Sequence, residues 1–155
     1  MKKEVNSPSP VKTEEIGEKF AGAILKARAW RRAKVISLEG ELGSGKTTFL
    51  KGVAKGLGIK EMIKSPTFVI MKKYKIGTGR RQQATRYFYH IDCYRIERPK
   101  EILGLGWEEM LERPQNIIAV EWGEKIRKIL PRDYLKIVFK FINKNTRKLS
   151  FKIHG

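Results

Sequence analysis

The stretch Gly40-Glu41-Leu42-Gly43-Ser44-Gly45-Lys46-Thr47 matches the pattern G-x-x-x-x-G-K-[ST] in full. It follows the apolar run Val35-Ile36-Ser37-Leu38, which predicts a short buried strand, and it precedes a segment that predicts a helix from about Lys46 to Leu57. Strand, glycine-rich loop and helix in this order are the context that the pattern requires. The stretch therefore predicts an α/β domain built around a phosphate-binding loop, or P-loop.

The P-loop residues have distinct expected roles. Its three glycines let the backbone turn its amides inward and form an anion-binding nest at the positive end of the helix. Lys46 is expected to reach the β- and γ-phosphates of a nucleoside triphosphate, and the Thr47 hydroxyl to bind magnesium. The residues expected to hold the phosphates are Gly40, Glu41, Leu42, Gly43, Ser44, Gly45, Lys46, Thr47 and Thr48. The alternative is a glycine-rich turn before an ordinary helix.

Hydrolysis also requires a carboxylate beside magnesium and a group that orients water. Two predicted strands end on acids: Tyr87 to Asp92, and Ile117 to Glu121. Because the carboxyl ends of such strands meet at the edge that carries the P-loop, Asp92 and Glu121 are candidate metal ligands and catalytic residues. For each acid, a solvated strand end remains the alternative.

The segment Lys64-Ser65-Pro66-Thr67-Phe68 is a polar turn that enters an apolar run. It resembles a switch loop, in which Thr67 would lie near the γ-phosphate and take part in catalysis. A plain turn at the start of a strand explains the same five residues.

The bulk composition indicates one compact domain. A chain of 155 residues with 41% apolar content can bury a core without disulfides. We expect a flexible leader over residues 1–12, because it contains Pro and Ser, and a single domain over 13–155. The single cysteine, Cys93, and the absence of a secretory signal or membrane-spanning run indicate a cytoplasmic protein that is not inserted in a membrane.

The net charge of +18 is unusual for this length. It favours phosphate-rich partners, although a solvated basic surface explains it equally well. The connection 77–86 is long for a hairpin and carries Arg80, Arg81 and Arg86, so it is a candidate contact for backbone phosphates of a nucleic acid or for a partner protein; a solvated hairpin tip is the alternative.

The remaining segments complete a three-layer α/β fold with a mixed, mainly parallel sheet. Thr13 is expected to cap a helix with an apolar face, and the runs 134–142 and 147–153 predict an antiparallel hairpin at a sheet edge. The segment 100–111 gives broken helical signals around Gly104 and Gly106. It is either part of the core or a surface that faces a partner.

Several motifs occur together in an order that resembles one family. The loop continues through Thr48-Phe49, and Glu121 is followed by Trp122. The motifs that carry the resemblance are Thr13-x-x-x-Gly17, the P-loop, Ser65-Pro66-Thr67-Phe68, His90-Ile91-Asp92-Cys93-Tyr94-Arg95 and Glu121-Trp122. Over roughly residues 13 to 125, the chain resembles the TsaE (YjeE) family, the bacterial P-loop ATPases of tRNA threonylcarbamoyladenosine biosynthesis.

This resemblance implies an ATPase that uses ATP and Mg²⁺, is slow when isolated, and supports the TsaB and TsaD proteins in threonylcarbamoylation of adenosine 37 of tRNA. It implies that Thr13 and Trp122 lie at the nucleotide, that Thr67 lies in the switch-like loop, and that Asp92 and Glu121 occupy the metal and catalytic positions. Arg95 either stabilises phosphate charge or pairs with a nearby acid.

The chain departs from the family pattern at three positions, where it has Glu41 for Asp, Ser44 for Ala and Gly123 for Pro. The two loop changes are compatible with phosphate binding, because the loop binds through backbone amides. Two rival functions remain at this stage: a small P-loop kinase, and a basic nucleic-acid-binding module that is not an enzyme.

Overall fold

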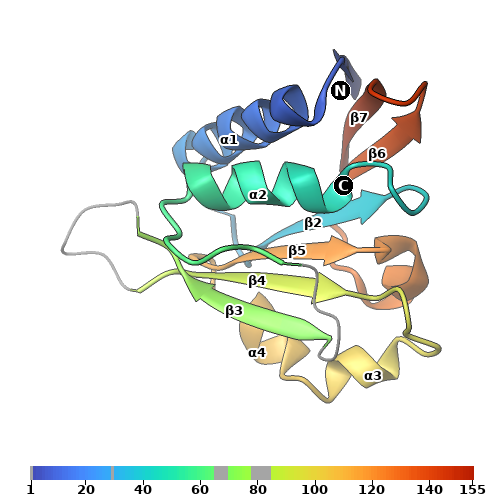
Figure 1. Ribbon diagram of the computed structural model, residues 1–155. Coiled ribbons are helices and arrows are strands. Elements are labelled where there is room, and N and C mark those ends of the chain that lie inside the picture. The colour runs from blue at the N-terminus through green and yellow to red at the C-terminus, as the bar shows by residue number, and fades with distance from the viewer. Residues whose placement is uncertain (1, 29, 65–69, 78–84) are drawn as a thin grey trace.

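The computed structural model describes residues 2–28, 30–64, 70–77 and 85–155 (Figure 1). These residues form one seven-stranded sheet in the order β1-β7-β6-β2-β5-β4-β3. The strands are β1 (Lys2–Ser7), β2 (Lys34–Glu39), β3 (Met71–Lys75), β4 (Tyr87–Asp92), β5 (Ile117–Glu121), β6 (Tyr134–Phe141) and β7 (Arg147–His154).

The sheet has a parallel centre and antiparallel flanks. β2 runs parallel to both β5 and β6, and β5 runs parallel to β4. β3 pairs antiparallel with β4 on one side, and β7 and β1 add antiparallel pairs on the other. The predicted mixed, mainly parallel sheet is therefore confirmed.

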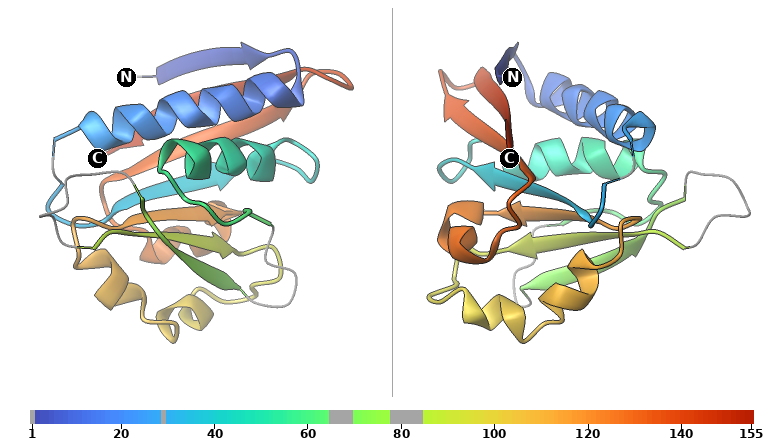
Figure 2. Two further views of the ribbon diagram at one scale, coloured as in Figure 1. Left: turned by 60° about the vertical axis from the view of Figure 1, so that its left-hand side comes forward. Right: turned by 180° about the vertical axis from the view of Figure 1, so that it is seen from behind.

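Helices cover the sheet on two faces (Figure 2). On one face, α1 and α2 pack against alternate strand residues such as Ile36 and Ala119, whereas α3, α4 and the 3₁₀ helix η1 pack against the intervening ones, such as Val35 and Ile118. The helices are α1 (Pro10–Lys26), α2 (Lys46–Gly56), α3 (Lys100–Leu103), α4 (Trp107–Leu111) and η1 (Gly123–Ile129). This arrangement is the expected three-layer α/β architecture.

The prediction of a flexible leader over residues 1–12 is wrong. Residues 2–7 form β1, which pairs along its whole length with β7, and Ser9 caps α1 by accepting a hydrogen bond from the Lys12 amide at 3.1 Å. Pro10 fits the first turn of the helix, where its missing N–H has no intrahelical partner to lose. Thr13 lies inside the helix and is not its cap. Because β1 forms the sheet edge, the β6–β7 hairpin lies one strand in from it.

The two helices beside the P-loop touch through glycines. A Cβ added at Gly52 of α2 would lie 1.8 Å from the Glu14 carbonyl oxygen, and one added at Gly17 of α1 would lie 2.2 Å from the Phe49 carbonyl oxygen. The helix backbones are therefore in direct contact, with no room for a side chain between them. This contact fixes α2, and with it the end of the P-loop, against α1.

The ambiguous segment 100–111 places part of its apolar residues in the core and leaves Leu103 and Leu105 exposed. It forms α3 and α4, and both Ile102 and Trp107 are fully buried. The Trp107 indole nitrogen donates a hydrogen bond to the Ile129 carbonyl oxygen at 3.1 Å, which ties α4 to the end of η1. The switch-like loop with Thr67 and most of the basic 77–86 connection lie outside the described residues. No helix of the described chain is long and apolar enough to cross a membrane.

The contact between α1 and α2 can be tested with Gly52→Ala. We expect this change to lower the free energy of unfolding by about 1–3 kcal/mol, because the new methyl group must displace the α1 backbone. Gly22→Ala is the matched control, since a Cβ at Gly22 of α1 meets nothing within 4 Å. It should stabilise the protein by up to about 1 kcal/mol through helix propensity. Urea unfolding of both variants measures the difference; equal stability of the two would contradict the packing.

Candidate functional site

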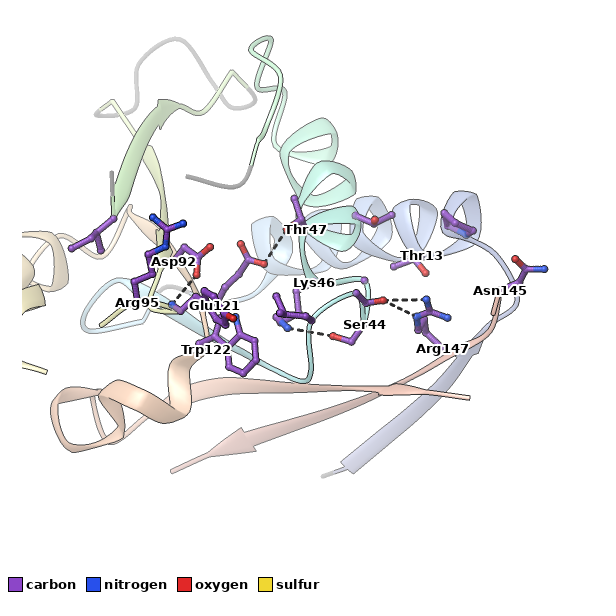
Figure 3. Close-up of a pocket in the computed structure, with 17 residues that line it drawn as sticks. Thr13, Ser44, Lys46, Thr47, Asp92, Arg95, Glu121, Trp122, Asn145 and Arg147 are labelled. Atoms are coloured by element: carbon purple, nitrogen blue, oxygen red, sulfur yellow. Dashed lines mark hydrogen bonds between the residues drawn. The ribbon is translucent and has the colours of Figure 1, made fainter. Parts of the chain in front are cut away.

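The carboxyl ends of three parallel strands meet beside the P-loop. The loop follows β2 directly, and the strand register places Glu121 of β5 opposite Leu38 of β2 and opposite Asp92 of β4. Figure 3 shows Asp92, Glu121 and Thr47 pointing into the same pocket. The two acids that sequence reasoning selected at strand ends are therefore brought together at the edge where the P-loop lies.

The glycines of the P-loop adopt conformations that other residues avoid. Gly40, Gly43 and Gly45 have φ values of 151°, 73° and 99°. A Cβ at Gly40 would lie 2.7 Å from the Phe139 carbonyl oxygen and 2.9 Å from the Ser44 Oγ, so this position also lacks space for a side chain. Gly45 precedes α2 as its N-cap, and no side chain caps that helix. The first amides of α2 thus remain available to an anion.

Lys46 is buried within the loop and lies against an aromatic ring. Its Nζ donates hydrogen bonds to the carbonyl oxygens of Gly40 and Glu41, the latter at 2.9 Å, and lies 4.4 Å from the centre of the Trp122 ring. Desolvation lowers the pKa of Lys46, and the negative charges of Glu121, Glu124 and Asp92 oppose this shift. Gly40 and Glu41 contact the Lys46 ammonium through their carbonyls and do not line the pocket themselves.

Glu121 links the P-loop helix to the centre of the sheet. Its Oε1 accepts a hydrogen bond from the Thr47 hydroxyl at 3.0 Å, and its Oε2 lies 2.6 Å from the Nε2 of His90, which is fully buried. Both oxygens of this buried carboxylate are therefore engaged. The contact with His90 holds the carboxylate plane so that Oε1 faces Thr47.

Asp92 and Arg95 lie on the far side of the pocket from the hairpin tip (Figure 3). The Oδ1 of Asp92 accepts a hydrogen bond from the Tyr94 amide at 3.0 Å, which fixes the turn after β4. The Tyr94 ring in turn packs against Trp122, with 5.2 Å between ring centres. Trp122 has a φ of 60°, the only positive φ among the described residues other than glycine, so its ring is turned out of the β5 direction over Lys46.

Sequence reasoning missed Arg147. Its Nε and Nη2 donate to the Gly43 carbonyl oxygen at 3.3 and 3.1 Å, its Nη1 donates to the Asn143 carbonyl oxygen at 2.7 Å, and its guanidinium lies over the Phe141 ring. Arg147 therefore ties the turn of the β6–β7 hairpin to the P-loop. No local signal identifies it, because only the strand order brings this residue to the loop.

These groups surround one cavity of about 470 Å³, large enough for a nucleotide. Thr13 lines it from α1, and its hydroxyl is held 2.7 Å from that of Ser7 in β1. The lining residues that sequence reasoning had selected are Thr13, Leu42, Gly43, Ser44, Gly45, Lys46, Thr47, Thr48, Asp92, Arg95, Glu121 and Trp122. Those that it had not selected are Pro10, Ile70, Tyr94, Asn145 and Arg147.

The oxygen atoms of the site suit magnesium, which takes few of its ligands from protein. They do not suit a metal ion that is coordinated by protein side chains alone. The described residues contain no group of three or more His, Cys, Asp or Glu that could hold a metal ion. A hydroxyl and a carboxylate 3.0 Å apart, at Thr47 and Glu121, match a magnesium ion that takes its other ligands from water and substrate phosphates. The site therefore suits a metal that arrives with a nucleotide.

A glycine-rich loop between β2 and α2, a buried lysine, a hydroxyl that contacts a strand-end carboxylate and a nucleotide-sized cavity define a P-loop nucleotide-binding protein. Comparison with known proteins identifies the family. Residues 7–149 match the family model of TsaE, the threonylcarbamoyl adenosine biosynthesis protein. The chain therefore belongs to the TsaE family, and the resemblance of its motifs is confirmed.

Individual relatives agree with this assignment. The TsaE of Bacillus subtilis is 40% identical over 138 residues, which cover 89% of this chain and 81% of that relative. The TsaE of Rickettsia bellii is 34% identical over 146 residues and 92% of each chain. The crystal structure of Bacillus subtilis YdiB has a TM-score of 0.73 at 32% identity and covers this whole chain and 87% of its own. Family and fold thus place this chain in tRNA threonylcarbamoyladenosine biosynthesis.

The contact between Arg147 and the P-loop predicts a role in holding the loop. Arg147→Ala should weaken binding of a nucleoside triphosphate roughly tenfold or more, because the Gly43 carbonyl loses its charged donor. Arg147→Lys should recover only part of this loss, since an ammonium cannot reproduce the fork that holds the Gly43 carbonyl through Nε and Nη2 and the Asn143 carbonyl through Nη1. Titration with a fluorescent nucleotide analogue gives both dissociation constants. Unchanged affinity in Arg147→Ala would show that the contact has no effect on the loop.

Proposed function

We propose that this chain is an ATPase that binds ATP with Mg²⁺, hydrolyses it slowly on its own, and supports a TsaB–TsaD complex in the threonylcarbamoylation of adenosine 37 of tRNA. Its site residues are Lys46, Thr47, Asp92 and Glu121, with Thr67 as a switch residue. Membership of the TsaE family supports the pathway. The contact between Thr47 and Glu121 supports the chemistry, because it joins the P-loop hydroxyl to a strand-end carboxylate.

The two carboxylates have different environments, which divides their proposed roles. Glu121 is buried, and its oxygens are engaged by Thr47 and His90, so it is held rigidly as the metal-side carboxylate. Asp92 is half-buried and lines the pocket next to it. We assign Asp92 to orienting the attacking water, because its carboxylate faces the cavity from the neighbouring strand.

The positive charges of the site stabilise the negative charge that develops on the transferred phosphoryl group. The Lys46 ammonium exchanges its carbonyl partners for phosphate oxygens, and the first α2 amides receive the phosphates. Magnesium, when bound at Thr47 and Glu121, neutralises charge on the β- and γ-phosphates. Arg95 lines the same cavity and adds a further positive group at its far side.

The proposed ATPase acts as a subunit. In the family pattern, the nucleotide state serves the transferase complex, and this chain performs no chemistry on tRNA. Slow turnover in isolation fits a pocket whose lining includes exposed side chains, such as Tyr94 and Leu42. The proposed location is the cytoplasm, where tRNA is modified.

Substitution of the site residues separates binding from turnover. Lys46→Ala should abolish ATP binding, because Lys46 is the one lysine among the described residues that line the pocket. Asp92→Ala and Glu121→Ala should bind ATP but lower turnover roughly 100-fold. Glu121→Ala should also raise the Mg²⁺ concentration needed for half-maximal rate, whereas Asp92→Ala should leave it unchanged. Phosphate release without an added acceptor, measured against Mg²⁺, checks these expectations.

Two results would overturn this mechanism. Normal hydrolysis in both carboxylate variants would remove Asp92 and Glu121 from catalysis. Phosphate release that depends on an added metabolite would replace the ATPase with a kinase. Leu42→Ala is a suitable control, because this exposed side chain lines the pocket without a polar group.

Dependence of the partner complex on nucleotide state tests the proposed role as a subunit. Immobilised protein should retain TsaB and TsaD from the same organism with ATP and release them with ADP. Lys46→Ala should retain neither partner in either state, because it cannot bind the nucleotide. Equal retention with ATP, with ADP and without nucleotide would contradict a role for nucleotide state, and no retention at all would contradict the partnership.

A further inference from the structure

One face of the sheet at β1, β7 and β6 carries a regular array of lysines. α1 and α2 cover the opposite face of these strands, where Phe139, Leu149 and Phe151 pack into the core. The three strands lie at the end of the sheet away from α3 and α4 (Figure 1). Apart from Tyr134, which is buried, the side chains on this second face are exposed or half-exposed. We call this array the lysine face; its residues are Lys2, Lys136, Lys140, Lys148 and Lys152.

Strand pairing arranges the lysine face in rows. Lys2, Lys152 and Lys136 are direct partners across the three strands, and Lys148 and Lys140 are partners two rows further along, beyond the row of Glu4, Ser150 and Val138. Neighbouring strands are about 4.8 Å apart, and residues on one face repeat every 6.7 Å or so along a strand. The two lysine rows are therefore about 13 Å apart, and neighbouring lysines within a row are about 4.8 Å apart, so the face presents two bands of positive charge to a polyanion.

The acids on this face do not neutralise it. Glu4 pairs with Lys2 at 3.0 Å and with Lys148 at 2.7 Å, and Glu39 pairs with Lys136 at 2.8 Å and with Arg127 at 3.6 Å. Two carboxylates thus stand against six positive side chains. Within the described part of the chain, Lys140 and Lys152 form no ion pair, and both are exposed.

His154 lies close to the lysine face and is affected by its charges. It stacks on Tyr134 with 4.6 Å between ring centres, at the end of the lysine face where β7 finishes. Its pKa is lowered from 6.5, first by desolvation and then by the charges of Lys152 and Lys136; Arg127 acts in the same direction and Glu39 opposes it. These groups from four elements therefore act on one point of this face.

The chemistry of the lysine face distinguishes nucleic acid from a membrane. Protein surfaces that bind anionic membranes place apolar side chains beside the basic ones, so that they enter the lipid. Here the residues between the lysines are Glu4, Asn6, Ser150 and the half-buried Val138. A flat, pleated, basic surface without apolar anchors fits a sugar–phosphate backbone. Among nucleic acids, RNA is favoured because the TsaE family acts in tRNA modification.

We propose that the lysine face of β1, β7 and β6 is a docking surface for the phosphate backbone of RNA, used without base recognition. This goes beyond the proposed ATPase, since it needs neither hydrolysis nor the nucleotide pocket. It rests on the geometry of the sheet, and the catalytic residues take no part in it.

Binding of a short fluorescently labelled RNA hairpin to the full chain tests this proposal. The variant Lys140→Gln, Lys148→Gln, Lys152→Gln should bind at least about tenfold more weakly at low salt, and its dependence of log K on log [KCl] should be shallower by roughly three. The control variant Lys19→Gln, Lys26→Gln, Lys51→Gln removes the same charge from exposed positions on α1 and α2. It should bind RNA nearly as well as the unaltered protein. Both variants should retain ATP hydrolysis and thermal stability.

Three outcomes would overturn the proposal. RNA affinity could be equal in the two variants, which would make the net charge alone responsible. RNA might fail to bind the unaltered chain at low salt. Vesicles of phosphatidylcholine and phosphatidylserine could bind more tightly than RNA and lose affinity in the lysine-face variant, which would assign the face to a membrane. Loss of ATPase activity with intact RNA binding would affect only the proposed function.

The histidine signals give a second measurement that folding defects do not imitate. The chain has two histidines, and one of them, His90, is fully buried. The NMR signals of His154 therefore need to be distinguished from those of one other histidine only. RNA phosphates on the lysine face should raise the pKa of His154 towards its ordinary value, whereas the RNA should leave the signals of His90 unchanged. A pKa of His154 that does not move at saturating RNA would place the RNA elsewhere and contradict the proposal.

Discussion

Parallel pairing between β2 and β5 is the constraint on which the site depends. This register places Leu38, the last core residue before the P-loop, opposite Glu121, and the pairing of β5 with β4 places Asp92 beside it. A shift by one residue would turn Glu121 to the other face of the sheet and break its contact with Thr47. The apolar faces of all three strands therefore fix the geometry of the candidate site, because burial on both sides of the sheet sets their register.

Segments near the two ends of the described chain form the wall of the pocket beside the P-loop. β1 and β7 form the antiparallel flank, α1 follows β1, and the resulting wall carries Thr13 and Arg147 to the P-loop. The direct backbone contact of α1 with α2 at Gly52 leaves this wall little freedom to move. The pocket is thus rigid on the side of Arg147. On the opposite side, Asp92 and Arg95 lie on turns that follow strands.

The parts of the site that depend on local sequence could be predicted, and those that depend on distant pairing could not. The P-loop, Asp92 and Glu121 each stand at the end of an apolar run, so a local pattern identifies them. Residues 2–7 have no apolar pattern because β1 is an exposed edge strand, and they were wrongly expected to be flexible. A local sequence pattern cannot identify Arg147, because its role arises from a contact with Gly43, which lies 104 residues earlier in the chain.

The β6–β7 hairpin contributes residues to both the pocket at the P-loop and the lysine face, so it connects these two sites physically. At its turn, Arg147 holds the P-loop, and the adjacent pair in the same ladder is Lys140 and Lys148 of the lysine face. Successive residues of a strand point to opposite faces, so a change in hairpin twist moves the guanidinium and the neighbouring ammonium groups together. Any preference of the hairpin for one nucleotide state must therefore appear, by linkage, as a difference in the affinity of the lysine face for a polyanion.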